Sequence, residues 1–446
     1  MNKSKLILSM LAVSLMAALP LSAQDYTKLS KFDENKPVGW CNIGISGGVT
    51  GSSDQNPVTV TTYEELRSAL QKCKGGKSSA TIYISGNIEC PEKLRFDKCE
   101  NMTIYGLPGS SLYYTQHTDN ADANPGFFCQ NWDNAIFRNI TIKGPGAYDI
   151  SGADNMQFVE STHIWVDHCD IQDGMDGNLD AKTKADFLTI SWCKFAYYIA
   201  PWANNESADH RCSSMWGSSN NRGDDEGHLN STFVNCWWYH GCGQRCPRIR
   251  FGNVHVANCL WENGTTEDPA QYCIGVGHQS DMYIENGDFS GTVTSGPHIK
   301  LYPGEKKIYD YIVTGNIGEP DTQVMGADGP GTYYNPYTYD YGKNGGGTYD
   351  INVYPAKYVK AALTDADNGA GATLDEDLLT SRGNPNLWHE GTDGIQGVNA
   401  PADDARVVGI EYFNLNGEKL SGQQKGINLI RFQMSDGTTR TQKVMK

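Results

Sequence analysis

The chain has 446 residues, of which 20% are charged and 39% hydrophobic, and it is rich in glycine (49), tyrosine (24) and tryptophan (10). This composition favours turns and aromatic strands and argues against a disordered chain or a coiled coil. The formal net charge of -16 argues against a protein that coats nucleic acid, because phosphate neutralisation requires a broad surface of lysine and arginine. Any polyanionic ligand must therefore be bound by local basic residues.

The N-terminal residues are predicted to form a cleavable signal peptide. Lys3 and Lys5 precede the apolar stretch Leu6–Leu21, and the Leu-Ser-Ala exit predicts cleavage after Ala23. No later stretch reaches the roughly 18 consecutive apolar residues of a membrane span. We expect a secreted protein without a membrane span, and the sequence leaves periplasm, cell surface and medium open.

Short strand patterns recur between about residues 79 and 290, where helical periodicity is nearly absent. Four cysteines within it, Cys169, Cys193, Cys236 and Cys259, are separated by 24, 43 and 23 residues. The first and third separations are close to one repeat length and the second is close to two repeat lengths. Such a regular spacing indicates a solenoid. Coils of this length are typical of a right-handed parallel β-helix, whose successive coils stack at about 4.8 Å. We expect an internal column of buried thiols rather than a redox site.

The segment before the repeats predicts a short capping helix. Thr62 and Glu65 have capping-box spacing, so a helix should begin near Tyr63. Such a helix would cover the open end of the solenoid, where strand edges and apolar interior are exposed. The predicted fold class is all-β: a right-handed parallel β-helix with a short N-terminal capping helix and a small C-terminal β-sandwich-like domain.

The expected division of the chain is a signal peptide at 1–23, a parallel β-helix domain at 24–398 and a C-terminal β-rich domain at 399–446. In the last part, short alternating strands surround Asn-Gly and Asp-Gly turns, which are typical of hairpins. This tail resembles the C-terminal sorting domains of proteins that are exported by the type IX route. A sorting or accessory role is therefore the expectation for it.

Three aspartates form the first candidate site. Asp154, Asp176 and Asp180 are spaced by 22 and 4 residues, so stacked coils can bring the first two onto adjacent turns and the third to the next strand. Three converging carboxylates repel one another unless a cation lies between them, and an all-oxygen cluster suits Ca²⁺. A solvated acidic rim is the alternative, and spacing alone does not decide between the two.

Arg245 and Arg250 form the second candidate site, one strand farther along. An arginine side chain is a fixed fork that binds carboxylates through two contacts and keeps its charge. Placed beside a calcium site, such a pair suits an acidic polymer as ligand. Structural ion pairing with neighbouring acids is the alternative.

Three segments in this order resemble the motifs of pectate lyases of polysaccharide lyase family 1: Thr162-His-Ile-Trp-Val-Asp-His168, Asp176-Gly-Asn-Leu-Asp180, and Arg245-x-Pro-x-x-Arg250-x-Gly252. The resemblance covers about Val38 to Ser290. It implies that Asp154, Asp176 and Asp180 bind calcium, that Arg245 is the catalytic arginine and that Arg250 binds the substrate carboxylate. Asp167 and His168 belong to the signature but are expected to be structural.

The chain departs from this family at a substrate-binding lysine. Family members place the lysine nine residues after the serine that matches Ser191, and here that count reaches Ala200. The stretch from Ala200 to Arg211 looks inserted, and Arg211 is our candidate for the missing positive charge. A substituted carbohydrate or an altered subsite is the competing interpretation. Gly152 stands where some relatives carry a further acid, which puts an additional calcium ion in doubt.

The resemblance implies β-elimination in homogalacturonan, with calcium as cofactor, an alkaline optimum, an acidic polysaccharide as partner and a monomeric protein. Pectin lyase and polygalacturonase-type hydrolysis on the same scaffold are the rival enzyme readings, and Asp173, Asp176 and Asp180 would serve the hydrolase. The third alternative is a catalytically silent β-helix that only binds pectin. Its sugars would stack on tryptophans, most of which we expect to pack inside the solenoid: Trp192, Trp202, Trp237, Trp238 and Trp261.

Overall fold

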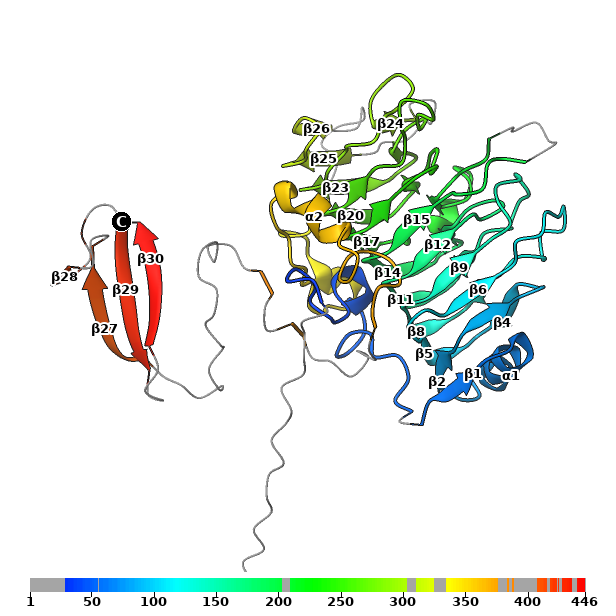
Figure 1. Ribbon diagram of the computed structural model, residues 1–446, viewed down its shortest axis with the longest axis horizontal. Helices are drawn as coiled ribbons and strands as arrows, with labels where there is room; N and C mark the ends of the chain where they lie inside the picture. The colour runs from blue at the N-terminus through cyan, green and yellow to red at the C-terminus, as the bar shows by residue number, and fades with distance from the viewer. Residues whose placement is uncertain are drawn as a thin grey trace, which may run out of the picture.

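A computed structural model describes residues 29–54, 56–202, 209–302, 310–324, 334–375, 383–384, 387–388, 407–414, 418–422, 424, 427–434 and 439–445. The predicted signal peptide lies outside this part of the chain. Most of the described residues form one solenoid whose coils run from α1 to β26 (Figure 1).

Three sheets run along the solenoid, and the largest has eleven strands. Its strands pair in parallel except for the last pair, which is antiparallel. In sheet order they are β1 (Val58–Val60), β2 (Ala80–Ile84), β5 (Glu100–Gly106), β8 (Asp133–Arg138), β11 (Thr162–Asp167), β14 (Asp186–Ser191), β17 (Ser231–Val234), β20 (Asn253–Ala257), β23 (Asp281–Glu285), β25 (Asp310–Thr314) and β26 (Thr322–Val324).

The other two sheets are parallel throughout and have eight and seven strands. The eight-stranded sheet contains β4 (Leu94–Asp97), β7 (Phe127–Gln130), β10 (Met156–Val159), β13 (Leu179–Lys182), β16 (Ser214–Trp216), β19 (Arg248–Ile249), β22 (Ile274–Val276) and β24 (Ile299–Leu301). The seven-stranded sheet contains β3 (Asn87–Glu89), β6 (Ser111–Tyr113), β9 (Thr141–Lys143), β12 (Asp170–Gln172), β15 (Lys194–Ala196), β18 (Trp237–Trp238) and β21 (Leu260–Trp261).

Between β2 and β23 each coil contributes one strand to each sheet, so strands that neighbour each other there are three apart in chain order; at the two ends of the solenoid the pairs β1–β2, β22–β24, β23–β25 and β25–β26 are closer in sequence. Alternate side chains of a strand point to opposite faces, and the in-register stacking turns every inward position into a column. On β13, Leu179 and Ala181 are fully buried, and Asp180 between them belongs to the outward row. The predicted parallel β-helix is confirmed.

The cysteine column is confirmed, but its spacing was misread. Cys169, Cys193, Cys236 and Cys259 follow strands that pair in register, and all four are fully buried. However, β14 pairs directly with β17, so the 43-residue separation is one coil and not two. The extra residues form a long connection, because the strands fix the coil while the turns between them can vary in length.

All thirteen cysteines are buried and unpaired. Burial raises the pKa of the Cys193 and Cys236 thiols well above its ordinary value, which disfavours the reactive thiolate. Buried thiols that pack as small apolar groups, as predicted, therefore describe the column.

The predicted capping helix is α1 (Tyr63–Cys73), which covers the first coil (Figure 1). The Thr62 hydroxyl accepts a hydrogen bond from the Glu65 amide at 3.2 Å. Leu66 and Leu70 are fully buried on the face toward the solenoid interior. The remaining helical segments are short: η1 (Gly39–Asn42), η2 (Gly223–Asp225), η3 (Tyr341–Asn344), η4 (Ala356–Tyr358) and α2 (Val359–Leu363).

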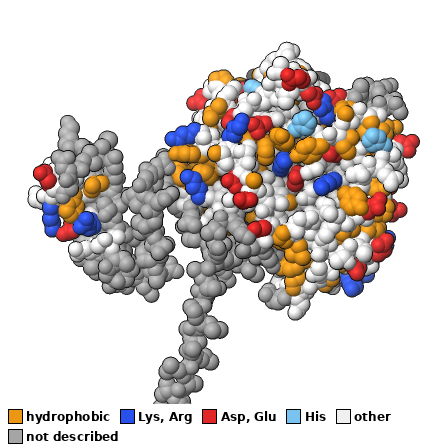
Figure 2. All heavy atoms as spheres, viewed as in Figure 1, with side chains coloured by type: hydrophobic (Ala, Val, Ile, Leu, Met, Phe, Trp, Pro, Cys, Tyr) orange, Lys and Arg blue, Asp and Glu red, His pale blue; other side chains and the backbone are white. Residues whose placement is uncertain are grey.

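The described C-terminal strands form one antiparallel sheet: β27 (Val407–Phe413), β28 (Lys419–Leu420), β29 (Ile427–Met434) and β30 (Thr439–Met445). The second layer of the expected sandwich is not among the described residues. On the face drawn in Figure 2, lysines and arginines of the solenoid are interspersed with acidic side chains. Among the described helices, none combines the length and apolar character that crossing a bilayer requires.

Candidate active site

The candidate site lies on the outside of the eight-stranded sheet. The strand register places Gln157, Asp180, Met215 and Arg248 in one row, one residue per coil. Their neighbours along each strand point into the core, so the row faces outward. Residues that are 23 to 35 positions apart in sequence are thereby held at strand spacing.

Asp154 and Asp180 face one point beside Gly177. A Cβ placed on Gly177 would lie 2.6 Å from Asp154 Oδ1 and 3.3 Å from Asp180 Oδ1, so only glycine leaves this space open. The Met215 amide donates to Asp180 Oδ1 at 3.0 Å, and Gln157 donates to Asp154 Oδ2 at 2.5 Å. Asp154 Oδ1 is buried and has no hydrogen-bond partner among the described residues.

Asp176 lies next to this pair but is directed toward His210. Its carboxylate accepts the Gly152 amide at 2.7 Å, and its Oδ1 lies 3.1 Å from His210 Nε2. The other ring nitrogen of His210 lies 3.3 Å from Asp149 Oδ1. Asp149, Asp176 and His210 have ligand atoms within 4.8 Å of one another and could together hold a metal ion. The structure therefore places Asp176 in a second, adjoining cluster.

The carboxylates differ in their pKa values. Burial raises the pKa of both Asp154 and Asp180, and the neighbouring aspartates raise it further. Burial acts in the same direction on Asp176, but contact with His210 holds the pKa of that carboxyl below its ordinary value. The pKa of His210 is raised to about 10, because its contact with Asp176 outweighs burial. With no metal ion bound, these contacts favour the protonated imidazole of His210 at neutral pH.

Two lysines lie beside the buried carboxylates. Lys182 Nζ lies 4.0 Å from Asp154 Oδ2, and Lys93 Nζ donates to the Gly152 carbonyl at 2.6 Å. Burial lowers the pKa of Lys93 to about 8. Gly152 is the position at which some members of the family that the sequence resembles carry a further acid. In this chain, lysine side chains lie near that position.

Arg245 and Arg250 converge on the sulfur of Met215. Arg245 Nη1 lies 3.7 Å and Arg250 Nη1 lies 3.5 Å from Met215 Sδ. Arg250 also donates to the Gly217 carbonyl at 2.7 Å and to Asn220 Oδ1 at 2.8 Å, which fixes its guanidinium. Since the Met215 amide binds Asp180, the arginines and the acid site meet at one residue.

Arg245 is the less restrained of the two. Its Nε is buried and has no partner among the described residues, and its backbone has a φ of 58°, in the left-handed region. Burial opposes its charged form, but Cys212 and Asp180 outweigh that effect, so its pKa lies above the ordinary value. The described side chains by themselves thus favour the protonated guanidinium.

Arg211 lies between two carboxylates. It donates to Asp209 at 2.8 and 2.7 Å and to Asp268 at 2.5 and 2.8 Å. These bonds raise its pKa above the ordinary value. The positive charge that the sequence assigned to substrate is therefore already matched by two acids.

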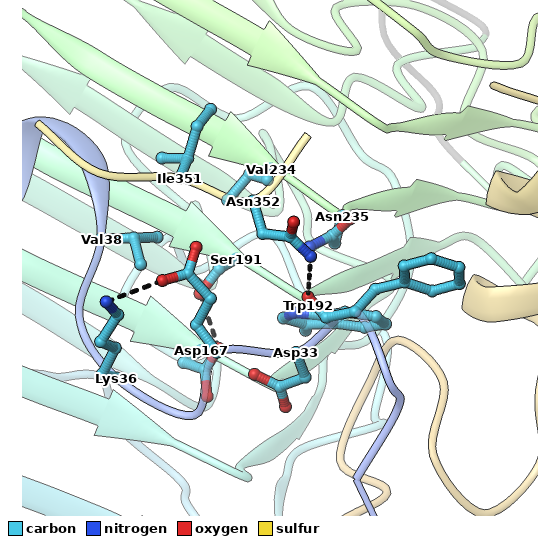
Figure 3. A pocket seen from close by; sticks show the side chains of 12 residues that line it. Asp33, Lys36, Val38, Asp167, Ser191, Trp192, Val234, Asn235, Ile351 and Asn352 are labelled. Carbon is cyan, nitrogen blue, oxygen red and sulfur yellow. Dashed lines mark hydrogen bonds and ion pairs between the residues drawn. The ribbon is translucent and has the colours of Figure 1, made fainter. Parts of the chain in front are cut away.

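Asp167 and His168 are structural, as expected. Asp167 is buried on β11 and accepts from Arg138 Nε at 2.7 Å and from Ser191 Oγ at 2.6 Å. His168 Nδ1 lies 2.8 Å from the same carboxylate. Figure 3 shows a small hollow on the eleven-stranded sheet that is lined in part by Asp33, Asp167 and Ser191. Its volume of about 10 Å³ has room for one water, so it offers no substrate site.

Two alternatives lose support from the geometry. Asp173 Oδ1 accepts the Tyr198 and Ile199 amides at 2.7 and 2.9 Å, so this carboxylate holds backbone rather than facing Asp180. Three tryptophans that a binding module would need are buried, as expected: Trp192, Trp238 and Trp261.

Four residues near the site are not among those predicted from the sequence: Lys93, Asp149, Lys182 and His210. Lys182 follows Asp180 by two residues on the same strand, which is a signal that could have been used. His210 lies in the predicted insertion from Ala200 to Arg211, directly before Arg211, the residue that the sequence predicts as the substrate-binding cation. No spacing rule places Asp149 or Lys93 near the site, because both lie on connecting segments.

The residues fit a cation. Asp154 Oδ1 is a buried acceptor without a donor, and an ion at the point beside Gly177 would satisfy it together with Asp180. Carboxylate oxygens are the ligands that Ca²⁺ prefers.

Fold and site define a parallel β-helix protein with an acid and arginine site on the outside of one sheet. The family model described as "Pectate lyase" matches residues 5–341. This chain belongs to the pectate lyase family.

Among similar proteins, "Probable pectate lyase B" of Aspergillus terreus is 34% identical over 238 residues, which are 52% of this chain and 63% of that protein. "Pectate lyase" of Bacillus subtilis is 32% identical over 278 residues, 56% of this chain and 58% of that protein. The chain thus spans less than two thirds of the length of these curated relatives. The solved structure "Pectate lyase bound to hexasaccharide" has a TM-score of 0.52 and 21% identity, and the match covers 77% of this chain and 98% of that one. It supports the fold.

Proposed function

We propose that the protein is a calcium-dependent pectate lyase, which cleaves (1→4)-α-D-galacturonan by β-elimination and releases 4,5-unsaturated oligogalacturonates. The observation that carries the proposal is the convergence of Arg245 and Arg250 on Met215, whose amide binds Asp180. An acid cluster that can hold a cation and two arginines that can bind a carboxylate therefore meet at Met215, a residue of the outward row. Family membership supports the same reaction.

Asp154, Asp176 and Asp180 are the proposed calcium ligands. A Ca²⁺ ion held there would supply charge neutralisation of the substrate carboxylate, which would make the neighbouring C5 proton more acidic. Asp176 would share its carboxylate with His210, which lies 3.1 Å away. The alternative position for an ion is the adjoining cluster of Asp149, Asp176 and His210.

Arg250 is the proposed carboxylate-binding residue. Its contacts with Gly217 and Asn220 fix the guanidinium before substrate arrives, so little side-chain entropy is lost on binding. A fixed guanidinium can stabilise the negative charge that develops on the carboxylate as the C5 proton leaves.

Arg245 is the proposed base. It takes the C5 proton, the C5–H electron pair forms the C4=C5 double bond, and the C4–O bond breaks with its electrons on the leaving oxygen, which is protonated by water. An ordinary guanidinium is almost entirely protonated at pH 7. Cancelling the negative charge of Asp180 would remove one of the causes that raise its pKa. We therefore expect an alkaline optimum.

The paired acids around Arg211 favour a positioning role for it. Its bonds to Asp209 and Asp268 hold the segment that carries His210 against Asp176. We propose that Arg245 and Arg250 make the direct substrate contacts and that Arg211 acts through its neighbours.

The test is an assay on polygalacturonate at alkaline pH, followed by the ultraviolet absorbance of the unsaturated product. The proposal expects absorbance with calcium and its loss with a chelator. Reducing ends without absorbance would identify hydrolysis and overturn the proposal. Highly methyl-esterified pectin as a second substrate separates a pectin lyase, because the arginines favour free carboxylates.

We also propose export by the predicted signal peptide and a sorting role for residues 399–446, with the mature protein as a monomer. Mass spectrometry of the exported protein tests the cleavage after Ala23. A mature protein that retains Met1 would contradict it.

A further inference from the structure

The outward row of the eight-stranded sheet continues past the candidate site. After Met215, the register runs through Arg248 and Gly275 to Lys300. Each step is one coil, so Lys300 lies roughly 14 Å from Met215 along the sheet. Two further cations thus follow the proposed cleavage site in line.

Arg248 is held against an aromatic ring. Its guanidinium carbon lies 3.9 Å from the ring centroid of Tyr302, a close cation–π contact. Gly275 makes this possible, since a Cβ there would come within 2.9 Å of Arg248 Cγ and 3.1 Å of Tyr302 Cε2. The side chain is therefore oriented before any ligand binds.

Lys300 lies over two rings of the same cluster. Its Nζ is 5.4 Å from the Tyr302 centroid and 5.2 Å from that of Tyr272. Lys300 is exposed, and Arg248 is half-buried. Tyr302 is half-buried and Tyr272 is buried, so the two cations share the outward surface with the ring of Tyr302.

The charges of Arg248 and Lys300 are not matched by acids. Within the described part of the chain, neither side chain forms an ion pair with a carboxylate, whereas Arg211 has two such partners. Arg248 Nε is buried and has no hydrogen-bond partner among the described residues. A half-buried cation without a counter-charge is costly unless a ligand supplies one.

We infer that Arg248, Lys300 and Tyr302, with Tyr272 beside them, form subsites for further uronate residues of the substrate, on the side of Met215 toward β24. The inference rests on the proposed function and deepens it. The carboxylates of successive sugar acids supply the missing counter-charges, and the half-buried ring of Tyr302 supplies apolar surface for a pyranose face, while the buried ring of Tyr272 packs against Tyr302.

The distances along the sheet predict how binding depends on the length of the oligosaccharide. A 1,4-linked sugar unit is comparable in length to one strand spacing, so Arg248 serves the sugar next to the cleavage site and Lys300 a sugar roughly two units farther on. Only the longer oligomers reach Lys300. Removing the charge of Lys300 should therefore lower kcat/KM on long substrates more than on short ones.

The experiment measures kcat/KM of the full chain on tri-, tetra-, penta- and hexagalacturonate for wild type, Lys300→Gln and Arg248→Gln. The matched control is Lys194→Gln, because Lys194 Nζ also lies 4.9 Å from two aromatic rings, those of Trp237 and Tyr239, but on the seven-stranded sheet. Thermal melting verifies that each variant is folded.

For Lys300→Gln, we expect the ratio of kcat/KM on hexagalacturonate to that on trigalacturonate to fall about 2–5-fold, as for an exposed charge pair. For Arg248→Gln, we expect a loss of about 10–100-fold on every length, as for a charged hydrogen bond. Lys194→Gln should leave the ratio unchanged. An unchanged ratio in Lys300→Gln, or an equal fall in the control, overturns the inference.

Calorimetric binding separates this inference from the proposed reaction. If wild type releases no unsaturated product, the proposed function fails, and binding still tests the subsites. Hexagalacturonate should bind Lys300→Gln more weakly than wild type, while a neutral hexasaccharide should not distinguish the two. Equal affinity of both proteins for hexagalacturonate would contradict the subsites.

Discussion

Two clusters of buried charge in the solenoid differ in how completely their polar atoms are paired. On the eleven-stranded sheet, both oxygens of Asp167 are bound: Arg138 and His168 contact one and Ser191 the other. Although burial disfavours its charge, His168 and Arg138 hold the pKa of Asp167 below the ordinary value. The Asp167 carboxylate is therefore fully paired by groups of the chain itself.

The cluster on the eight-stranded sheet is incomplete. Asp154 Oδ1 and Arg245 Nε are buried without partners among the described residues, and burial raises the pKa of Asp154 and Asp180. Both clusters contain acids and arginines from adjacent coils. We therefore expect the first cluster to stabilise the fold and propose that the second binds a ligand.

Arg245→Lys should have the largest effect, because it changes the group that the proposed reaction uses as base. The expected loss is about 10²–10⁴-fold in kcat on polygalacturonate, followed by product absorbance. Arg222→Lys is the control, since Arg222 is exposed and paired with Asp224. Activity of Arg245→Lys within a few-fold of wild type would rule out the base assignment.

Asp167→Asn should act on stability instead. It leaves Arg138 buried without its counter-charge, so we expect a loss of about 3–5 kcal/mol in the free energy of unfolding, measured by urea denaturation. Asp133→Asn is the control, because the Asp133 carboxylate is 49% exposed. Equal losses of unfolding free energy in the two variants would show that the buried pairing of Asp167 stabilises the fold no more than the exposed carboxylate of Asp133.

Asp180→Asn should reduce the stabilisation of the protein by calcium. Saturating calcium should stabilise wild type by about 2–4 kcal/mol, seen as a rise in melting temperature, and this rise should largely vanish in the variant. Without calcium, the variant should be at least as stable as wild type, since it removes one of two repelling carboxylates. A full calcium response in Asp180→Asn would exclude this residue as a ligand.

The pH dependence should be the smallest effect. Folding lowers the pKa of Asp167, so its contribution to stability is present at neutral pH and is lost as the pH falls through the lowered value. The difference in unfolding free energy between wild type and Asp167→Asn should stay constant from pH 7 to about 5 and shrink by about 1 kcal/mol or more below pH 4. A difference that grows toward acid pH would contradict the assignment.

Periodicity predicted the part of the molecule that repeats. The spacing of Asp154 and Asp176 reflects one coil, and the cysteines that follow paired strands reveal the column. The 43-residue gap between Cys193 and Cys236 was misjudged, because a long connection and an extra coil give the same count.

Connecting segments could not be predicted in the same way. His210 reaches Asp176 from the long connection between β15 and β16, and Arg211 pairs with Asp268 from another loop. Loop conformation depends on tertiary contacts rather than on a repeat, so spacing predicted neither pairing. The candidate aspartates and arginines came from motifs, but their partners required the structure.

The central claim is that Asp154 and Asp180 hold a cation beside Gly177, next to the arginines. The most direct measurement is a crystal structure of Arg245→Lys grown with calcium and trigalacturonate. We expect calcium in contact with Asp154 Oδ1 and Asp180 Oδ1, and a substrate carboxylate at Arg250. Calcium bound only by Asp149, Asp176 and His210 would contradict this site. A sugar bound away from the outward row of the eight-stranded sheet would contradict it as well.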